Sequence, residues 1–375
     1  MEHKTIGCRY FIGEKPCRFH PDCAAEACMD YKTFGPRILI IKLDAMGDVL
    51  RTTPVLPEIK KLYPECHVTW VVSFESREIL ERNPYIDRLV SAEPDELFCL
   101  LEEEFDVVYS LDKGPLAIAL ANKVKAGKRI GFCMNRYGAL GYFNDESGYA
   151  FRLGFNNTLK FRENQKTYQQ IIFEMCGFSG PYGEYIYEQD PAAEKEAERL
   201  FAAWGIKPGE RVVGINTGAG KVFATKKWPA SSFIELAKLL SGTKRTKVLL
   251  LGGPQEKELN AMIAKKLGKA AVNAGTENPV SLFCGIVARC GVLVTADTLA
   301  MHLAIARKRK VVALFGATSA VEVDLYGRGI KLSKDVSCAP CYRSSCDDLR
   351  CMKEIFPRDV YDACESLLKQ NEGGA

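Results

Sequence analysis

Residues 37–54 decide the fold, and their sequence is RILIIKLDAMGDVLRTTP. The stretch opens on four consecutive apolar residues at 38–41, and strands that are apolar on both faces occur in parallel sheets covered by helices on both sides. A turn at residues 44–48 then leads into a helical pattern that extends to about Tyr63. This strand–turn–helix unit predicts a doubly wound α/β domain.

The same alternation continues along the chain, on both sides of a stretch at residues 177–191 that is rich in Gly, Pro and Tyr. Further strands are expected at 68–73, 86–90, 106–111, 129–132, 212–216, 247–251, 292–295 and 311–315. A length of 375 residues fits two domains, because domains commonly have about 100–200 residues. We predict a Cys-rich extension at residues 1–35, followed by two Rossmann-like domains at 36–180 and 181–340 that face across a cleft. A tail at 341–375 would carry a helix that returns to the first domain.

The composition is that of an ordinary globular protein, with 47% hydrophobic and 26% charged residues. Lys and Arg number 51 and Asp and Glu 47, so the net charge is +4. That surplus is too small to indicate nucleic acid, although a modest basic face would suit an anionic ligand or a membrane surface. The first residues form no signal peptide, and the longest apolar runs are far shorter than the roughly 18 residues of a spanning helix. A cytoplasmic location is expected.

The turn at residues 44–48 contains no G-x-G-x-x-G, so a dinucleotide site is poorly supported there. Gly47 and Asp48 stand at the start of a helix instead. A helix N-terminus favours an ionised carboxylate, and glycine permits close approach of another group. Asp48 would act as a general base on a hydroxyl if it faces the cleft. The alternative is that Asp48 only caps its helix.

Three further strand ends carry candidate groups for a nucleotide diphosphate. The first is NTGAG at residues 216–220, including Thr217, followed by TKKWP at 225–229. Free amides of a small-residue turn hold anionic oxygens, and a lysine supplies a point charge to a diphosphate. The alternative is a solvated loop with unpaired lysines.

The second is TADTLAMH at residues 295–302, where a helix starts at Asp297 or Thr298. Helix N-terminal amides together with a Thr hydroxyl form a diphosphate site, and His302 shares a helix face with Thr298. The alternatives are an N-cap at Asp297 and a satisfied buried imidazole at His302.

The third is LGGPQE at residues 251–256, where Gln255 or Glu256 would accept hydrogen bonds from ribose hydroxyls. The alternative is a carboxylate that the helix dipole favours at a helix start.

Eight of the fifteen cysteines fall in two clusters. Clustered thiols in a large chain favour metal over disulfide, and each cluster has enough soft ligands for one zinc or one iron–sulfur cluster. We therefore expect structural metal sites, or one site with ligands from both ends of the chain; buried or reversibly oxidised thiols are the alternative. The cysteines are Cys8, Cys17, Cys23 and Cys28 in one cluster, and Cys338, Cys341, Cys346 and Cys351 in the other.

Taken together and in this order, the motifs at residues 38–54, 225–229, 251–254, 297–304 and 312–318 resemble glycosyltransferase family 9, the ADP-heptose:lipopolysaccharide heptosyltransferases. The resemblance covers roughly residues 36–365. It implies a GT-B architecture, with the acceptor on the first domain and the sugar nucleotide on the second. It also implies inverting transfer without a required metal or other cofactor, from a donor such as ADP-heptose to a glycolipid or glycan of the lipopolysaccharide core. Such an enzyme would make peripheral contact with the cytoplasmic face of the inner membrane.

The resemblance also assigns roles to single residues. Asp48 matches the base and Lys226 the lysine that binds the donor phosphates. Asp297, Thr298 and the following amides match the diphosphate turn, with His302 as its histidine. The best match for the ribose contact is Glu256. Common members have Asp-Ser-Gly-Pro-Met-His at the diphosphate turn, whereas this chain has Leu299 and Ala300 in place of Gly-Pro.

Two other classes of protein remain as alternatives at this point. One is a redox or structural protein whose thiols carry iron–sulfur or zinc centres on an α/β scaffold, which metal analysis would reveal. The other is a sugar-nucleotide epimerase of the same two-domain fold, which would consume its sugar nucleotide without an acceptor.

Overall fold

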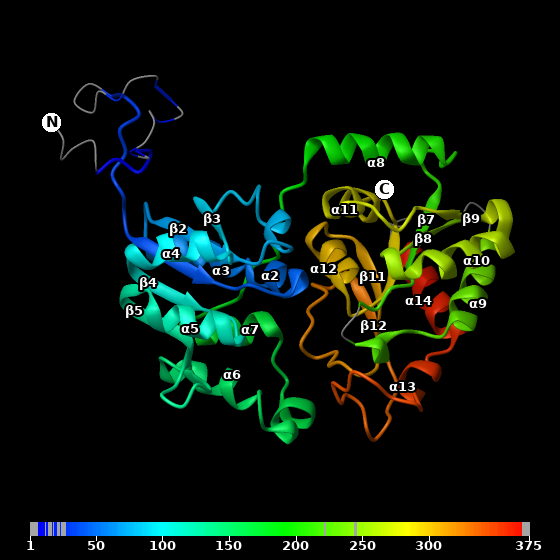
Figure 1. Ribbon diagram of the computed structural model, residues 1–375. Helices are drawn as coiled ribbons and strands as arrows, with labels where there is room; N and C mark the ends of the chain where they lie inside the picture. The colour runs from blue at the N-terminus through cyan, green and yellow to red at the C-terminus, as the bar shows by residue number, and fades with distance from the viewer. Residues whose placement is uncertain are drawn as a thin grey trace.

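A computed structural model describes residues 7–11, 13, 17, 19–20, 23, 28–220, 223–243 and 246–369. In this part of the chain, two six-stranded sheets with helices on both faces form two α/β domains side by side (Figure 1). The predicted fold class is therefore confirmed. Among the described helices, none has both the length and the apolar character needed to cross a membrane.

The first sheet has the order β3-β2-β1-β4-β5-β6, and all its neighbours are parallel except β5 and β6. Its strands are β1 (Arg37–Ile41), β2 (His67–Val72), β3 (Arg88–Ser91), β4 (Glu104–Ser110), β5 (Lys125–Met134) and β6 (Leu140–Tyr142). The helices of this domain are α2 (Met46–Thr52), α3 (Val55–Leu62), α4 (Pro94–Glu102), α5 (Pro115–Lys123), α6 (Gly148–Arg152) and α7 (Tyr168–Met175).

The helix expected between the turn and Tyr63 is two helices, α2 and α3. The break falls at Pro54, which is the N-cap of α3. Proline has no backbone N–H and its ring clashes with the preceding turn, so it is tolerated at a helix start but not inside a helix.

The second sheet has the order β12-β11-β10-β7-β8-β9 and is parallel throughout. Its strands are β7 (Arg211–Asn216), β8 (Thr246–Leu251), β9 (Ala271–Asn273), β10 (Val292–Ala296), β11 (Lys310–Phe315) and β12 (Gly329–Ser333). The helices are α8 (Pro191–Ala203), α9 (Ala230–Ser241), α10 (Lys257–Leu267), α11 (Val280–Ala288), α12 (Leu299–Ala306), α13 (Arg350–Lys353) and α14 (Pro357–Lys369).

In each sheet the order of the strands reverses direction next to the strand that comes first in the sequence. The reversal falls between β1 and β4 in the first sheet and between β7 and β10 in the second. Ligands of open α/β sheets bind outside the carboxyl ends of the strands at such a point. The helices that follow at these points, α2 and α12, pack against one another where the domains meet (Figure 1). The fold therefore brings the two switch points together.

Alternate residues of each strand feed cores on opposite faces of the sheet, as a period of two requires. In β10, Val292 and Val294 pack in the core that contains α9 and α14, whereas Leu293 packs with α11 and α12. All five β10 residues are buried. The apolar runs of the sequence are thus central strands with both faces covered.

The C-terminal helix α14 packs against α9 and strands β10 and β11 of the second domain. Its buried face contains Val360, Cys364 and Leu367, which join the same core as Val292 and Val294. The expectation that the tail helix returns to the first domain is therefore wrong. Without α14, one face of the second sheet would be exposed next to α9. The apolar side of α14 covers it.

The described part of the N-terminal extension lies beside the first domain, on the side away from the second (Figure 1). It has one isolated antiparallel bridge, between Cys8 and Thr33. Arg9 forms an ion pair with Asp87 of the first domain. No helix or strand of three residues or more occurs among the described residues before β1.

Candidate active site between the two domains

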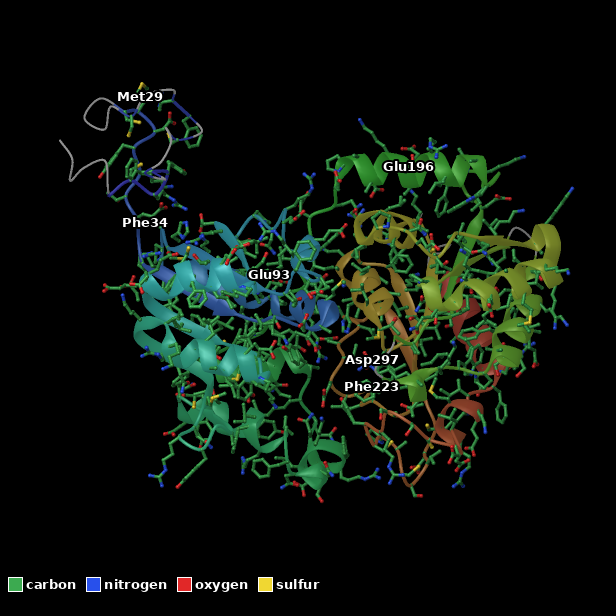
Figure 2. All side chains as sticks on the ribbon, in the orientation of Figure 1. Met29, Phe34, Glu93, Glu196, Phe223 and Asp297 are labelled. Carbon is green, nitrogen blue, oxygen red and sulfur yellow. The ribbon has the colours of Figure 1, made fainter. Side chains whose placement is uncertain are left out.

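A cavity of about 720 Å³ lies between the domains and is lined by residues of both. Figure 2 labels Asp297 and Phe223, which lie on the side of the second domain that faces the first. Six of the predicted site residues line this cavity, namely Asp48, Lys226, Asp297, Thr298, Leu299 and His302. Residues separated by about 250 positions in the sequence are thus brought to one space.

Asp48 lies in the first turn of α2 and contributes no side-chain capping bond to that helix. Its Oδ1 is 2.7 Å from Nη2 of Arg51, one turn later. The Arg51 guanidinium lies 3.7 Å from the ring centroid of Tyr168, so it is held from two sides. Burial alone would raise the pKa of Asp48, but the charges of Arg51 and Lys42 outweigh it and lower the pKa. Asp48 is an ionised carboxylate on the cavity wall.

Lys226 and Asp297 form an ion pair on the opposite wall. The Lys226 Nζ lies 3.1 Å from Asp297 Oδ2 and donates to the Asp297 carbonyl oxygen at 3.0 Å. Burial opposes ionisation of Asp297, yet the neighbouring Lys226 lowers its pKa overall. A cation is therefore fixed at the helix start of α12, where backbone N–H groups also favour an anion.

His302 connects this wall to the first domain. Its Nε2 is 3.8 Å from Asp297 Oδ1, and its Nδ1 is 3.3 Å from the Tyr185 hydroxyl. Burial and the charge of Arg51 lower the pKa of His302 to about 4, so the imidazole is neutral near pH 7. A Cβ atom added at Gly47 would lie 2.5 Å from Cδ2 of His302. The two domains meet through a glycine and a buried, neutral imidazole.

Gly47→Ala is expected to push the imidazole of His302 or the two domains apart. Overpacking of this kind costs about 1–3 kcal/mol in the free energy of unfolding. Thermal and urea unfolding should show the loss. A Gly47→Ala variant with unchanged stability would show that the contact between α2 and α12 is not maintained in solution.

Thr217 and Glu256, also predicted for the donor, do not line this cavity. The Thr217 hydroxyl is buried, bonded to Asn260 Oδ1 at 2.6 Å and to the Leu251 carbonyl at 3.2 Å. Glu256 is buried and accepts from the Gly253 N–H at 3.1 Å, so it performs the helix-start role that was the alternative. Thr298 is at the cavity, and its hydroxyl lies 3.0 Å from that of Thr295.

A second cavity of about 340 Å³ adjoins the first on the side of the first domain. Three lysines line it, namely Lys42, Lys113 and Lys160, and Asp48 and Arg51 line both cavities. Lys42 is 3.1 Å from Asp112, whereas Lys113 donates to the Ala150 carbonyl at 2.8 Å. Burial and the nearby Lys160 charge lower the pKa of Lys113 to about 8. Four basic and four acidic side chains line this cavity. Because Lys113 bonds to a carbonyl oxygen and not to a carboxylate, an anionic group of a ligand would be drawn to Lys113.

Several residues of the two cavities were not expected from the sequence, namely Arg51, Tyr168, Glu322 and Tyr342. Arg51 stands inside the quoted motif, three residues after Asp48, and that helical spacing is the signal that would have found it. Tyr168, Glu322 and Tyr342 come from separate segments, and only the fold brings them to the cleft.

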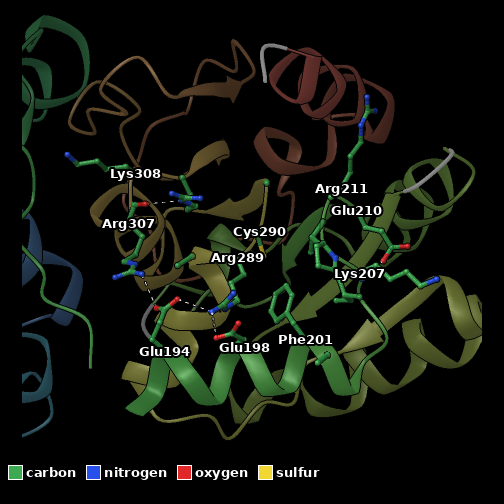
Figure 3. A pocket seen from close by; sticks show the side chains of 18 of the residues that line it. Glu194, Glu198, Phe201, Lys207, Glu210, Arg211, Arg289, Cys290, Arg307 and Lys308 are labelled. Atoms are coloured by element: carbon green, nitrogen blue, oxygen red, sulfur yellow. Dashed lines mark hydrogen bonds and ion pairs between the residues drawn. The ribbon is translucent and has the colours of Figure 1, made fainter. Parts of the chain in front are cut away.

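A further cavity, of about 980 Å³, lies at the amino ends of β7, β10 and β11, at the opposite edge of the second sheet. Figure 3 shows Glu194 paired with Arg289 and Arg307, at 3.3 and 3.0 Å. These arginines follow the last residues of α11 and α12, where the helix dipoles favour cations. Their charge is therefore balanced locally, and the residues predicted to bind the diphosphate lie in the other cavity.

The fifteen cysteines are free thiols. The four thiols of the first cluster line one small cavity of about 20 Å³ together with His20. Burial and the three other thiols of the second cluster raise the pKa of Cys351, so the four thiols of that cluster lie near one another. The described residues contain no group of three or more His, Cys, Asp or Glu side chains arranged to hold a metal ion. A structural metal at either cluster stays a prediction, and the clusters lie too far apart in Figure 1 for one shared site.

Relatives of known function match this chain in sequence. Lipooligosaccharide heptosyltransferase 2 of Campylobacter jejuni is 29% identical over 174 residues, which are 44% of this chain and 54% of that protein. This chain therefore spans about half the length of that relative. Lipooligosaccharide heptosyltransferase 2 of Haemophilus influenzae is 25% identical over 301 residues, covering 75% of this chain and 84% of the relative.

The fold is also that of solved glycosyltransferases. A family 9 glycosyl transferase from Veillonella parvula superposes with a TM-score of 0.74 at 20% identity, covering 90% of this chain and 99% of that one. A model of glycosyltransferase family 9 (heptosyltransferase) matches residues 99–351, which is more than half of the chain. The chain therefore belongs to glycosyltransferase family 9.

Proposed function

We propose that the enzyme transfers heptose from a nucleoside diphosphate donor such as ADP-heptose to a hydroxyl of a lipopolysaccharide-core or related glycan acceptor, with inversion at the anomeric carbon. One observation carries the proposal. Ionised Asp48 and the pair of Lys226 and Asp297 stand on opposite domains and line the same cavity. Single displacement needs this arrangement, because the base must act on the face of the sugar opposite the leaving group.

In the proposed reaction, the carboxylate of Asp48 accepts the proton of the acceptor hydroxyl while the oxygen bonds to the anomeric carbon. The bond from that carbon to the diphosphate oxygen breaks, and its electrons leave with the nucleoside diphosphate. Lys226 and the helix start at Thr298 stabilise the developing charge, as preorganised donors do. The low pKa of Asp48 is compatible with proton transfer late in the displacement.

The donor proposal is supported by a structural neighbour, an Escherichia coli heptosyltransferase WaaC solved with ADP, which superposes with a TM-score of 0.57 at 19% identity. The acceptor proposal is supported by Lys113 of the adjoining cavity, which bonds to the Ala150 carbonyl and not to a carboxylate, so that a carboxylate or phosphate group of a core glycan would be attracted to it. No metal is proposed for the transfer step, since Lys226 and the helix start supply the stabilisation.

The experiment is a transfer assay with ADP-heptose and a lipopolysaccharide-core acceptor, with the product mass and anomeric configuration measured. We expect a gain of one heptose with inversion, and turnover that EDTA changes by less than about twofold. Transfer from another sugar nucleotide in preference would overturn the donor, and retention would overturn single displacement. Consumption of ADP-heptose without acceptor would overturn the role of the acceptor.

The acceptor cavity predicts a pH dependence through Lys113. Its pKa is lowered to about 8, so Lys113 loses its positive charge as the pH rises through that value. Binding of an anionic acceptor is therefore expected to weaken above about pH 8 as an increase in acceptor KM. Lys113→Gln should raise the acceptor KM at pH 7 and remove this alkaline change. A wild-type KM that is constant to pH 9 would contradict a charged acceptor at Lys113.

A further inference from the structure

The segment of residues 336–343, here called the thiol loop because it carries Cys338 and Cys341, connects the two domains. It follows β12 in the second domain and precedes α13 (Figure 1). From the first domain, Arg162 donates to the carbonyl oxygens of Ser337 at 2.6 Å and Ala339 at 3.1 Å. The nucleotide-binding half thus presents a loop to the half that holds the acceptor cavity.

Tyr342 is the residue of this loop that reaches the cleft, and it lines both cavities. Its ring stacks on Phe161 of the first domain, with centroids 5.4 Å apart and planes 20° from parallel. The Nζ of Lys160 lies 3.8 Å from the ring centroid, and the Tyr342 hydroxyl donates to Glu322 Oε2 at 3.1 Å. Burial raises the pKa of Tyr342, so the hydroxyl stays a donor near neutral pH.

The backbone of Tyr342 is in the left-handed region, with φ +54°. A bulky non-glycine residue is uncommon there and persists where its surroundings hold it, often at a functional site. The Cys341 and Tyr342 N–H groups both donate to the Ala317 carbonyl, at 3.0 and 2.9 Å. The left-handed turn directs the ring toward the cleft while the loop backbone stays anchored to the second domain.

The thiol loop is also bonded to the turn that carries the donor lysine. The Thr225 hydroxyl donates to the Arg343 carbonyl at 2.6 Å, and Lys226 is the next residue after Thr225. One short segment therefore contacts Lys160 and Phe161 of the acceptor side and the lysine turn of the donor side. A bound acceptor that touches Tyr342 meets a group whose position is tied to the donor site.

We infer that Tyr342 is an acceptor-positioning residue: its ring forms the wall that the donor and acceptor cavities share and aligns the acceptor hydroxyl with the donor. This inference rests on the proposed transfer reaction and adds to it a residue from the second domain that acts on the acceptor. Lys160 and Phe161 hold the ring from the first domain. Arg162 holds the loop that carries it.

The test compares Tyr342→Gly with Tyr342→Phe. Glycine removes the ring but adopts the left-handed backbone without strain, so the loop is preserved. We expect Tyr342→Gly to lower kcat/KM for the acceptor by about 30-fold or more while the donor dissociation constant stays near the wild-type value. The melting temperature should fall in Tyr342→Gly, because the packing on Phe161 and the bond to Glu322 are lost. Tyr342→Phe keeps the ring and should retain at least about a third of wild-type kcat/KM.

The matched control is Leu349→Gly, because Leu349 is also left-handed, with φ +52°, follows in the same region and lines neither cavity. It should leave acceptor kcat/KM within about threefold of wild type. Unchanged kinetics of Tyr342→Gly would overturn the inference, as would a loss of donor affinity as large as the loss of acceptor kcat/KM, which indicates a merely structural role. A wild-type enzyme without heptosyl transfer contradicts the proposed function itself, and the inference falls with it.

Discussion

Asp48→Asn is expected to lower kcat by between about 10²- and 10⁴-fold, the range that a general base contributes. The amide has nearly the size of the carboxylate and cannot accept the acceptor proton as a base. Donor affinity should change little, because the groups proposed to bind the diphosphate, Lys226 and the helix start at Thr298, lie on the second domain and do not include Asp48. Turnover and donor binding are measured separately, by product formation under saturating substrates and by thermal stabilisation with the donor.

A control for the loss of an ion pair is Glu58→Gln. Glu58 and Lys61 of α3 form a pair with the same spacing as Asp48 and Arg51, at 3.5 Å, but outside the cleft. This variant should keep wild-type turnover. If Asp48→Asn retains more than about a tenth of wild-type kcat, Asp48 is not the base.

Lys226→Ala is the second substitution with a large expected effect. Removing a group that stabilises developing charge costs about 10²- to 10³-fold in kcat. The donor dissociation constant should also increase, since the ammonium is lost in the ground state as well. The variant leaves the Asp297 carboxylate, whose side chain is 18% exposed, without its cation, so a lower melting temperature is expected too.

Lys227→Ala is the matched control for this variant. Lys227 is adjacent in sequence and carries the same charge, but its side chain is 43% exposed and pairs with Glu256 at 3.7 Å, away from the cavity. Its removal should leave kcat and donor affinity within about threefold of wild type. Equal losses in the two variants would mean that general positive charge, and not the position of Lys226, supports the donor.

The sequence was sufficient to predict those helices and strands that a few consecutive residues determine. Apolar runs of three to five residues with turns behind them predict buried parallel strands, and β1, β8, β10 and β11 were found where such runs occur. Strand β9, with three residues, carries too short a pattern to detect. The break between α2 and α3 was present in the sequence as Pro54, and the general rule against proline inside a helix would have found it.

The site was predictable to the extent that its residues stand at carboxyl ends of strands. Asp48, Lys226 and Asp297 were expected from such positions and do line one cavity. Thr217 stands at a similar position, but its hydroxyl turns inward to Asn260, because a buried amide and a hydroxyl satisfy one another there. Side-chain direction after a strand depends on packing, which spacing in the sequence does not record.

Sequence patterns could not predict the residues that come to the site from loops. Tyr342 meets Lys160 of the other domain across 182 positions of the chain, and no periodicity links them. Likewise, the amphipathic pattern of α14 shows that the helix has an apolar face but not which sheet covers it. Long-range placement requires the packed structure.

The most direct measurement is a crystal structure of the Asp48→Asn enzyme with ADP-heptose bound, since this variant should bind the donor without turning it over. We expect diphosphate oxygens within hydrogen-bond distance of Lys226 Nζ and of the backbone N–H groups that follow Thr298. Residue 48 should then face the anomeric carbon from the side opposite the diphosphate. A donor held instead by Arg289 and Arg307 in the cavity at the far edge of the sheet, or one whose sugar points away from α2, would contradict a shared catalytic cleft.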